Sequence, residues 1–228
     1  MTPGWLVPLT ALIVALIGVL QEQIRRFFFG PKLDLWYDPE SLVDSHRTTY
    51  VLVSLVMDLR LRTELETFWV RLRVANTGKM PAHSVELIAK ELWRRSVGAT
   101  EFTRDPKFSP LGLKWAFVGK PVLDTLPAQI EKHCDLLHIP DPARTSERGV
   151  RAYLELEVQP NASPGVLVPG DYKLVLVAVA SDAGPRTRTV SFTVPPEWTT
   201  DEREMQRRVR LTGVPSQSPI MAEPEMPG

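Results

Sequence analysis

The clearest pattern in the chain is an alternation of apolar and other residues in its middle third. Every second residue over positions 68–74 is apolar, and arginine or tryptophan stands between them. Successive residues of a β-strand point to opposite faces, so this spacing predicts a strand with one buried face. The turn residues Asn76, Thr77 and Gly78 follow, and positions 85–90 alternate again. We therefore expect residues 67–93 to form two neighbouring strands.

Similar short runs, separated by proline and glycine, predict further strands. They lie at residues 33–37, 49–62, 113–118, 130–139, 152–158, 172–180 and 190–194. The segment 49–62 fits one long strand or two short ones. The run at 172–180 is apolar at nearly every position, which is typical of a central strand covered on both faces. Roughly eight or nine strands without intervening helices favour an antiparallel sandwich, which we assign to residues 30–198.

The pattern changes after the two prolines at 195–196. Thr199 and Glu202 have the spacing of a capping box, which predicts a short helix within residues 199–211. Residues 212–228 contain four prolines and few apolar residues. We expect this last segment to be a disordered tail.

The N-terminal segment, residues 1–29, shows neither the strand alternation nor the capping-box spacing. From Trp5 to Leu20 no residue is charged, and ten residues are leucine, isoleucine or valine. At about −0.3 to −0.6 kcal/mol each, these ten contribute on the order of −3 to −6 kcal/mol to membrane insertion. A helix of this length covers roughly 24 Å of a hydrocarbon layer about 30 Å thick, so its flank must complete the span. We expect one transmembrane helix that contacts the lipid bilayer through Trp5 to Leu20.

Three other interpretations of this segment make demands that the sequence does not meet. A cleaved signal peptide needs positive charge before the apolar run, and residues 1–4 carry only the terminal amine. A buried core helix or an amphipathic surface helix needs a polar face, and this run is apolar all round.

The charges beside the anchor predict its orientation. Arg25, Arg26 and Lys32 follow the apolar run against one opposing Glu22, and no basic residue precedes it. The positive-inside rule therefore places the β domain in the cytoplasm and the N-terminus outside. The alternative is an extracytoplasmic domain, because sandwiches on a single anchor are often found there.

Composition narrows the choice of partners. The 228 residues contain 27 basic and 27 acidic residues, so no overall field favours nucleic acid. The single cysteine, Cys134, excludes an intramolecular disulfide framework. The expected partner is another protein, of a kind that net charge does not specify.

The densest group of metal-ligand residue types is His133, Cys134 and His138, with Asp135 beside them. On a regular strand Cys134 and His138 would share a face and His133 would point to the other, so at most two converge. We therefore predict no metal site and keep Cys134 and His138 as weak candidates. No motif for phosphate binding, dinucleotide binding, a hydrolase nucleophile or a zinc protease is present, so we expect no catalytic or cofactor-binding residue.

Two other groups of residues suggest contacts rather than chemistry. Four arginines of the C-terminal helix could form a basic surface, although Asp201, Glu202 and Glu204 offset it. Tryptophan is enriched at binding hot spots, and the candidates here are Trp69, Trp93, Trp115 and Trp198. In a sandwich most of them should instead cover the core or its edges.

Residues 72–85, which join two strands through an Asn-x-Gly turn, resemble bacterial immunoglobulin-like modules of the CARDB type. The sequence Pro-Gly-Asp-Tyr at 169–172, followed by an apolar strand, is similar to the penultimate strand of such modules. The whole layout also resembles an uncharacterised family of bacterial single-pass membrane proteins. The resemblance implies an immunoglobulin-like sandwich with a binding or structural role, and it assigns no functional residue.

Together these features predict a membrane-anchored, non-enzymatic binding or scaffold module. Two alternatives stay open. One is a metal-dependent factor or enzyme that uses Cys134 and His138, and the other is an accessory subunit of an envelope or transport complex.

Overall fold

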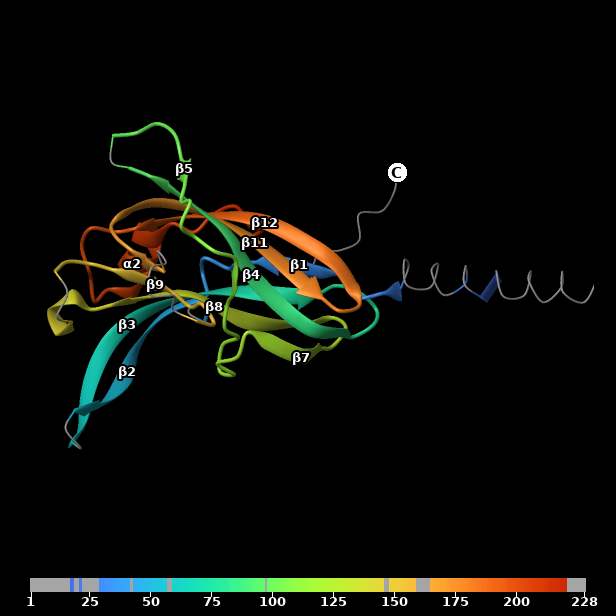
Figure 1. Ribbon diagram of the computed structural model, residues 1–228, viewed down its shortest axis with the longest axis horizontal. Helices are drawn as coiled ribbons and strands as arrows, with labels where there is room; N and C mark the ends of the chain where they lie inside the picture. The colour runs from blue at the N-terminus through green and yellow to red at the C-terminus, as the bar shows by residue number, and fades with distance from the viewer. Residues whose placement is uncertain are drawn as a thin grey trace, which may run out of the picture.

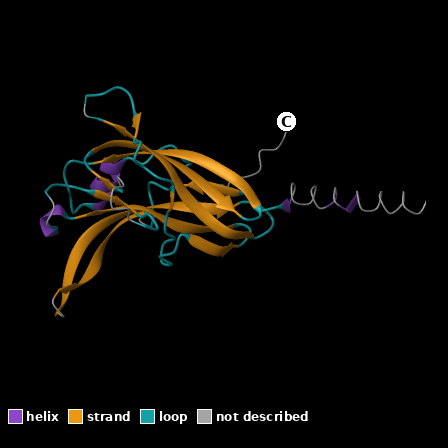
Figure 2. Cartoon of the chain, in the orientation of Figure 1, coloured by secondary structure: helices purple, strands orange, loops and turns teal. Residues whose placement is uncertain are grey.

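The computed structural model describes residues 17–18, 21, 29–41, 43–56, 59–96, 98–145, 148–158 and 165–220, with the backbone alone for residues 50–56 and 59–64. Within them the chain is mainly β and forms two antiparallel sheets and one short α-helix (Figures 1 and 2). Sheet A contains β1 (Leu33–Trp36), β2 (Ser45–Val56), β3 (Leu59–Asn76), β8 (Ile130–Pro140), β9 (Ala152–Leu154) and β10 (Val166–Leu167). Sheet B contains β4 (Ala82–Arg95), β5 (Thr103–Arg104), β6 (Leu111–Gly112), β7 (Val122–Leu126), β11 (Gly170–Ala180) and β12 (Ala183–Val194).

The two sheets face each other across one hydrophobic core. Sheet A has the order β1-β3-β8-β9-β10, with β2 also paired to β3. Sheet B has the order β12-β11-β4-β5, with β6 and β7 also paired to β4. The alternation predicted for β3 is confirmed, because Phe68, Val70 and Leu72 are buried in the core. The strand predicted at 130–139 is also confirmed, as β8.

The prediction that residues 67–93 form two neighbouring strands is wrong. β3 lies in sheet A and β4 in sheet B, so the turn at Asn76 carries the chain from one sheet to the other. The buried Asn76 side chain stabilises this corner: its Oδ1 accepts hydrogen bonds from Lys32 N and Gly78 N, and its Nδ2 donates to the carbonyls of Met80 and Leu126. A hairpin turn and a corner between sheets use the same residue types, which is why the pattern did not separate them.

Several strand boundaries differ from those expected. Residues 49–62 belong to two strands, β2 and β3, that pair as a hairpin. The expected strand at 113–118 is a crossing segment instead, in which Leu113 and Trp115 each make a single bridge, to Leu156 and Cys134. β11 is central in sheet B, but its residues alternate between buried and half-buried, so only one of its faces is covered.

The C-terminal helix is α2 (Glu202–Val209), and its N-cap is Asp201 rather than the expected Thr199. Asp201 Oδ1 accepts a hydrogen bond from Glu204 N at 2.9 Å, because a carboxylate at this position satisfies a free backbone donor of the first turn. Met205 and Val209 are buried in the core cluster, so α2 closes one end of the sandwich.

Residues 212–220, expected to begin a disordered tail, lie against the sandwich. Thr212 exchanges backbone hydrogen bonds with Ser191, and Tyr37 N donates to Pro215 O at 3.0 Å. The rest of the expected tail, residues 221–228, lies outside the described residues.

The expected anchor also lies mostly outside the described residues. Within 5–20 only Ile17 and Gly18 are described, and they are helical, as are Gln21 and Phe29. Among the described residues, no helix is long and apolar enough to cross a membrane.

Candidate functional site

The outer face of sheet A, which points away from the core, carries a dense group of charged and aromatic residues. Because Phe68, Val70 and Leu72 point inward, the residues between them on β3 point outward. The antiparallel neighbour β8 contributes a second row of outward residues beside them. The outward residues are Trp69, Arg71 and Arg73 of β3 and Glu131, His133, Asp135 and His138 of β8. Antiparallel sheets often turn one polar face to water, but here ion pairs and stacked rings fill that face.

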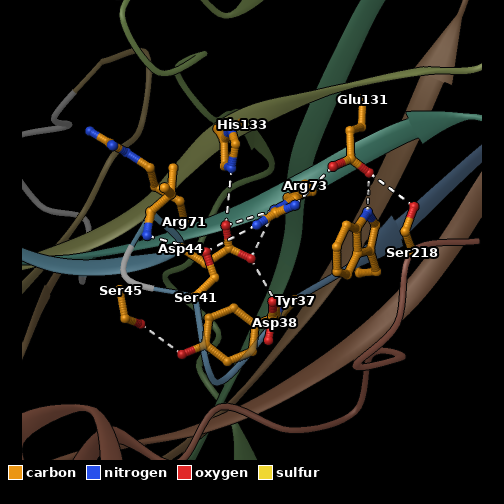
Figure 3. A network of polar contacts seen from close by, with 12 residues as sticks. Tyr37, Asp38, Ser41, Asp44, Ser45, Arg71, Arg73, Glu131, His133 and Ser218 are labelled. Carbon is orange, nitrogen blue, oxygen red and sulfur yellow. Dashed lines mark hydrogen bonds and ion pairs between the residues drawn. The ribbon is translucent and has the colours of Figure 1, made fainter. Parts of the chain in front are cut away.

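Asp44 lies at the centre of the charged part of this face (Figure 3). It comes from the loop between β1 and β2, and its side chain is fully buried. Its carboxylate accepts hydrogen bonds from Arg73 Nε at 2.7 and 3.0 Å, from His133 Nε2 at 3.0 Å and from Asp38 N at 2.9 Å. Burial alone would raise the pKa of Asp44, but the contacts with His133, the Asp38 amide and Arg73 outweigh it and lower that pKa.

Arg73 connects Asp44 to the neighbouring strands. Its NH1 group donates to Glu131 Oε1 at 2.8 Å and its NH2 group to Ser41 Oγ at 3.0 Å. The guanidinium also lies 4.3 Å from the centroid of the Trp36 ring. β1, β8 and the loop before β2 therefore meet at one arginine.

Glu131 links the segment after α2, which contains Ser218, to the same network by hydrogen bonds. Besides Arg73, it accepts hydrogen bonds from Trp36 Nε1 at 2.8 Å and from Ser218 Oγ at 3.1 Å. Residues far apart in the sequence, on β1, β3, β8 and the segment after α2, thus share one carboxylate.

The second half of the outer face is aromatic. Trp69, His138 and Tyr153 face one another on β3, β8 and β9 in register. The ring centroids of Trp69 and His138 are 5.0 Å apart, and those of His138 and Tyr153 are 5.1 Å apart and nearly parallel. His138 Nδ1 contacts Glu155 Oε1 at 2.5 Å, and this contact, together with Lys114, lowers the pKa of Glu155 against the raising effect of burial.

Arg71 joins the charged and aromatic halves. Its Nε donates to Asp135 Oδ1 at 2.6 Å, and its guanidinium lies 5.9 Å from the Trp69 centroid and 4.6 Å from the Phe117 centroid. Phe117 stands at the end of the loop after Trp115, with a φ of 65° and 85% of its surface exposed. We call Trp69, Arg71, Phe117, His138 and Tyr153 the aromatic patch.

The residues singled out as metal-ligand candidates do not meet at one point. A bulge in β8 places both Leu136 and Leu137 in the core, so His133 and His138 share the outer face while Cys134 points inward. The expectation that Cys134 and His138 share a face is therefore wrong. Cys134 is fully buried, its Sγ contacts Lys114 O at 3.2 Å, and burial raises the pKa of its thiol well above the ordinary value.

Within the described part of the chain, no three residues of the metal-ligating types converge. Of the four tryptophans considered as anchors, Trp198 packs against the core, and Trp93 on β4 donates a hydrogen bond from Nε1 to Glu91 Oε2 at 3.1 Å. Trp115 is a core residue whose Nε1 donates to Val85 O and Pro121 O, whereas Trp69 belongs to the aromatic patch. The basic side of α2 is partly neutralised, because Arg203 pairs with Glu40 and Arg208 with Glu204.

Sequence reasoning did not find Asp44, Glu131, Glu155, Tyr153 or Phe117. Asp44 and Phe117 lie in loops, where no periodicity marks a residue as buried or exposed. The arginines of β3 were the available signal, since two outward arginines next to a tryptophan on one strand require acidic or aromatic neighbours on the strands beside it.

The fold and this face describe a two-sheet β protein with a charged and aromatic outer surface on one sheet. Comparisons with known protein families, with curated proteins and with solved structures find no match to this chain.

Proposed function

We propose that the chain is a membrane-tethered, non-enzymatic binding module that recognises another protein through the aromatic patch on the outer face of sheet A. The observation that carries this proposal is Phe117, a large apolar side chain that is 85% exposed while its ring lies over the Arg71 guanidinium. An exposed ring of this kind gains free energy when a partner covers it.

The composition of the patch supports recognition of a protein surface. Tryptophan, tyrosine and arginine are the residues most enriched at binding hot spots. In the patch Arg71 is already paired with Asp135, and His138 with Glu155. A partner that covers the patch therefore does not have to bury an unpaired charge.

Rigidity is the second property that favours binding. The patch residues lie on β3, β8 and β9 and on the Phe117 loop, and the Asp44 network ties β3 and β8 to the loop before β2. Residues held in place before binding lose less conformational entropy when a partner arrives. The buried network thus supports the patch without itself contacting the partner.

The proposal keeps the immunoglobulin-like assignment of the sandwich and the single-pass anchor through Trp5 to Leu20. The anchor would hold the module at a membrane, in the cytoplasm by the charges of Arg25, Arg26 and Lys32, or on the other side in the alternative orientation. Protease accessibility of the sandwich in intact cells distinguishes the two. Digestion from outside would contradict the cytoplasmic assignment.

Affinity purification of the full chain from detergent-solubilised membranes tests the binding role. The matched variants are Phe117→Ala and Ile130→Ala, because Ile130 is also an exposed apolar residue, 45% exposed, but lies at the start of β8 opposite Asn76, at the other end of the strand from His138. Recovery of a specific partner should be similar with the wild type and with Ile130→Ala, and should fall roughly tenfold or more with Phe117→Ala, as loss of a hot-spot residue predicts. Undiminished recovery with Phe117→Ala, or no specific protein with any of the three chains, would contradict the proposal.

A further inference from the structure

Part of the β2–β3 hairpin extends beyond the sandwich as a two-stranded ribbon (Figure 1). Residues 50–56 of β2 pair with residues 59–65 of β3, from Tyr50 opposite Leu65 to Val56 opposite Leu59. β8 pairs with β3 only from Thr67 onward. Among the described residues, no further strand pairs with this ribbon. An isolated two-stranded ribbon is marginally stable in water, so its persistence needs another surface.

The apolar positions of β3 change face where the ribbon begins. Within the sandwich the residues of β3 that belong to the core cluster are even-numbered, namely Phe68, Val70, Leu72 and Val74. In the ribbon the apolar residues of β3 are odd-numbered, namely Leu59, Leu61 and Leu65. The pairing of β3 with β2 is regular throughout, so this change is not caused by a bulge. The apolar positions of the ribbon therefore lie on the side of the sheet opposite to the core.

Cross-strand pairing assigns eight residues to this face. They are Tyr50, Leu52, Ser54, Val56, Leu59, Leu61, Thr63 and Leu65, which include six apolar residues and no acidic or basic one. The opposite face contains Val51, Val53, Leu55, Arg60, Arg62 and Glu64. A sheet face with this composition is normally buried.

The edge of β2 differs from the other long edge strand in a way that supports burial. β12 is the edge of sheet B and carries Pro185, Arg186 and Arg188, residues that discourage pairing with another chain. Positions 48–56 of β2 contain no proline and no charged residue. The same chain therefore protects one edge and leaves the other open to association.

We propose that the ribbon is a self-association element, whose apolar face packs against the same face of a second copy of this chain. Because the face has no acidic or basic residue, two copies can meet about a twofold axis without placing like charges together. Nothing on the face favours a partner of opposite charge over a second copy.

The area available fits a dimer. Burying one apolar side chain of this size removes roughly 60–120 Å² of apolar surface from water. Six residues in each of two copies then bury about 700–1,400 Å², which reaches the range of specific interfaces, about 1,200–2,000 Å².

The position of the ribbon favours a second copy over a lipid surface. Leu33, the first residue of β1, pairs with Asn76 at the far end of β3, whereas the ribbon includes the first residues of β3. The 18 residues of β3 span roughly 59 Å at about 3.3 Å per residue, so the ribbon points away from the end at which the N-terminal segment enters. Copies held in one membrane by that segment would present their ribbons at the same height.

The test is the association state of the full chain in mild detergent, measured against concentration by light scattering and sedimentation. Leu61→Glu places a charge on the apolar face, and Leu55→Glu places the same charge on the other face, opposite Arg60. We expect the wild type and Leu55→Glu to dimerise with similar affinity, and Leu61→Glu to weaken the dimer at least 100-fold. Circular dichroism and the unfolding midpoint show whether each variant is folded.

Disulfide trapping provides an independent readout, because the native Cys134 is fully buried. Ser54→Cys lies in the middle of the apolar face and Val53→Cys beside it on the other face. Mild oxidation should link two copies through Cys at 54 and not through Cys at 53.

Three results would overturn the inference. They are a wild-type chain that stays monomeric at all concentrations, equal effects of Leu61→Glu and Leu55→Glu, and binding of the ribbon to anionic vesicles in place of a second copy. A monomer that still captures a partner through Phe117 would refute self-association and leave the proposed binding function standing.

Discussion

Arg73 Nε on β3 lies 2.7 Å from Asp44 Oδ1 in the loop before β2, and the Asp44 side chain is fully buried. This contact fixes the loop that leads into the β2–β3 hairpin against β3 near its C-terminal end. Through Arg73 it is linked to Glu131, and through Glu131 to Ser218. One buried carboxylate thereby positions the origin of the ribbon, the strands under the aromatic patch and the C-terminal segment.

Asp44→Asn should destabilise the fold by about 3 kcal/mol. Removing one partner of a buried ion pair costs about 3–5 kcal/mol, and the lower value applies because Glu131 still neutralises Arg73. Urea unfolding measures the change. The control is Glu40→Gln, which removes the exposed pair between Glu40 and Arg203 and should cost less than about 1 kcal/mol. Equal effects of the two substitutions would show that the Asp44 network contributes no more than a surface pair.

The same carboxylate predicts a pH dependence. The pKa of Asp44 is lowered in the folded chain, whereas in the unfolded chain it returns to the ordinary value of an aspartate side chain. The unfolded state therefore binds the proton more readily, and the stabilisation is complete above the unfolded value and is lost as the pH falls through the folded one. The difference in unfolding free energy between wild type and Asp44→Asn should be largest at neutral pH and shrink below about pH 4. A difference that grows on acidification would contradict this assignment.

The sequence predicted strands better than it predicted which strands are neighbours. Alternation over positions 68–74 identified β3 because burial of one face imposes a period of two, and the run at 130–139 was predicted as a further strand, which is β8. It did not show that Asn76 turns a corner between sheets, since that depends on carbonyls of Met80 and Leu126 brought near by folding. The consecutive apolar residues Leu136 and Leu137 were a readable sign of the bulge that separates Cys134 from His138.

The charged network was less accessible to sequence reasoning than the strands. Ion pairs such as Arg73 with Asp44 and Arg71 with Asp135 join segments 29 and 64 residues apart. No local pattern pairs an arginine with one of the 27 acidic residues of the chain. The transmembrane anchor and the membrane orientation stay predictions.

Gly78→Ala should destabilise the corner between the sheets. A Cβ atom at Gly78 would lie 2.6 Å from Pro31 Cα and still closer to the Gly30 carbonyl oxygen, so the backbone before β1 would have to move. Overpacking of this kind costs about 1–3 kcal/mol. Thermal unfolding measures the loss. Gly184→Ala is the matched control, because a Cβ atom there meets nothing within 4 Å. A loss of stability in the control alone, or in neither variant, would contradict the close approach at Gly78.

Cys134 should be unreactive in the native chain. Its thiol is fully buried, burial raises its pKa well above the ordinary value, and the thiolate is the form that reacts with alkylating reagents. Labelling by iodoacetamide should therefore be much slower than at a Ser216→Cys control, which places a second thiol on an exposed position. The two rates should become equal in urea.

The same labelling experiment tests the alternative function, a metal-dependent factor or enzyme that uses Cys134 and His138. A metal bound to Cys134 requires the thiolate to be formed in the folded chain. Zinc added before labelling should leave the slow native rate and the unfolding midpoint unchanged, since His138 lies on the other face of β8. Rapid native labelling that zinc suppresses, together with a raised unfolding midpoint, would restore Cys134 as a ligand and require a different arrangement of β8.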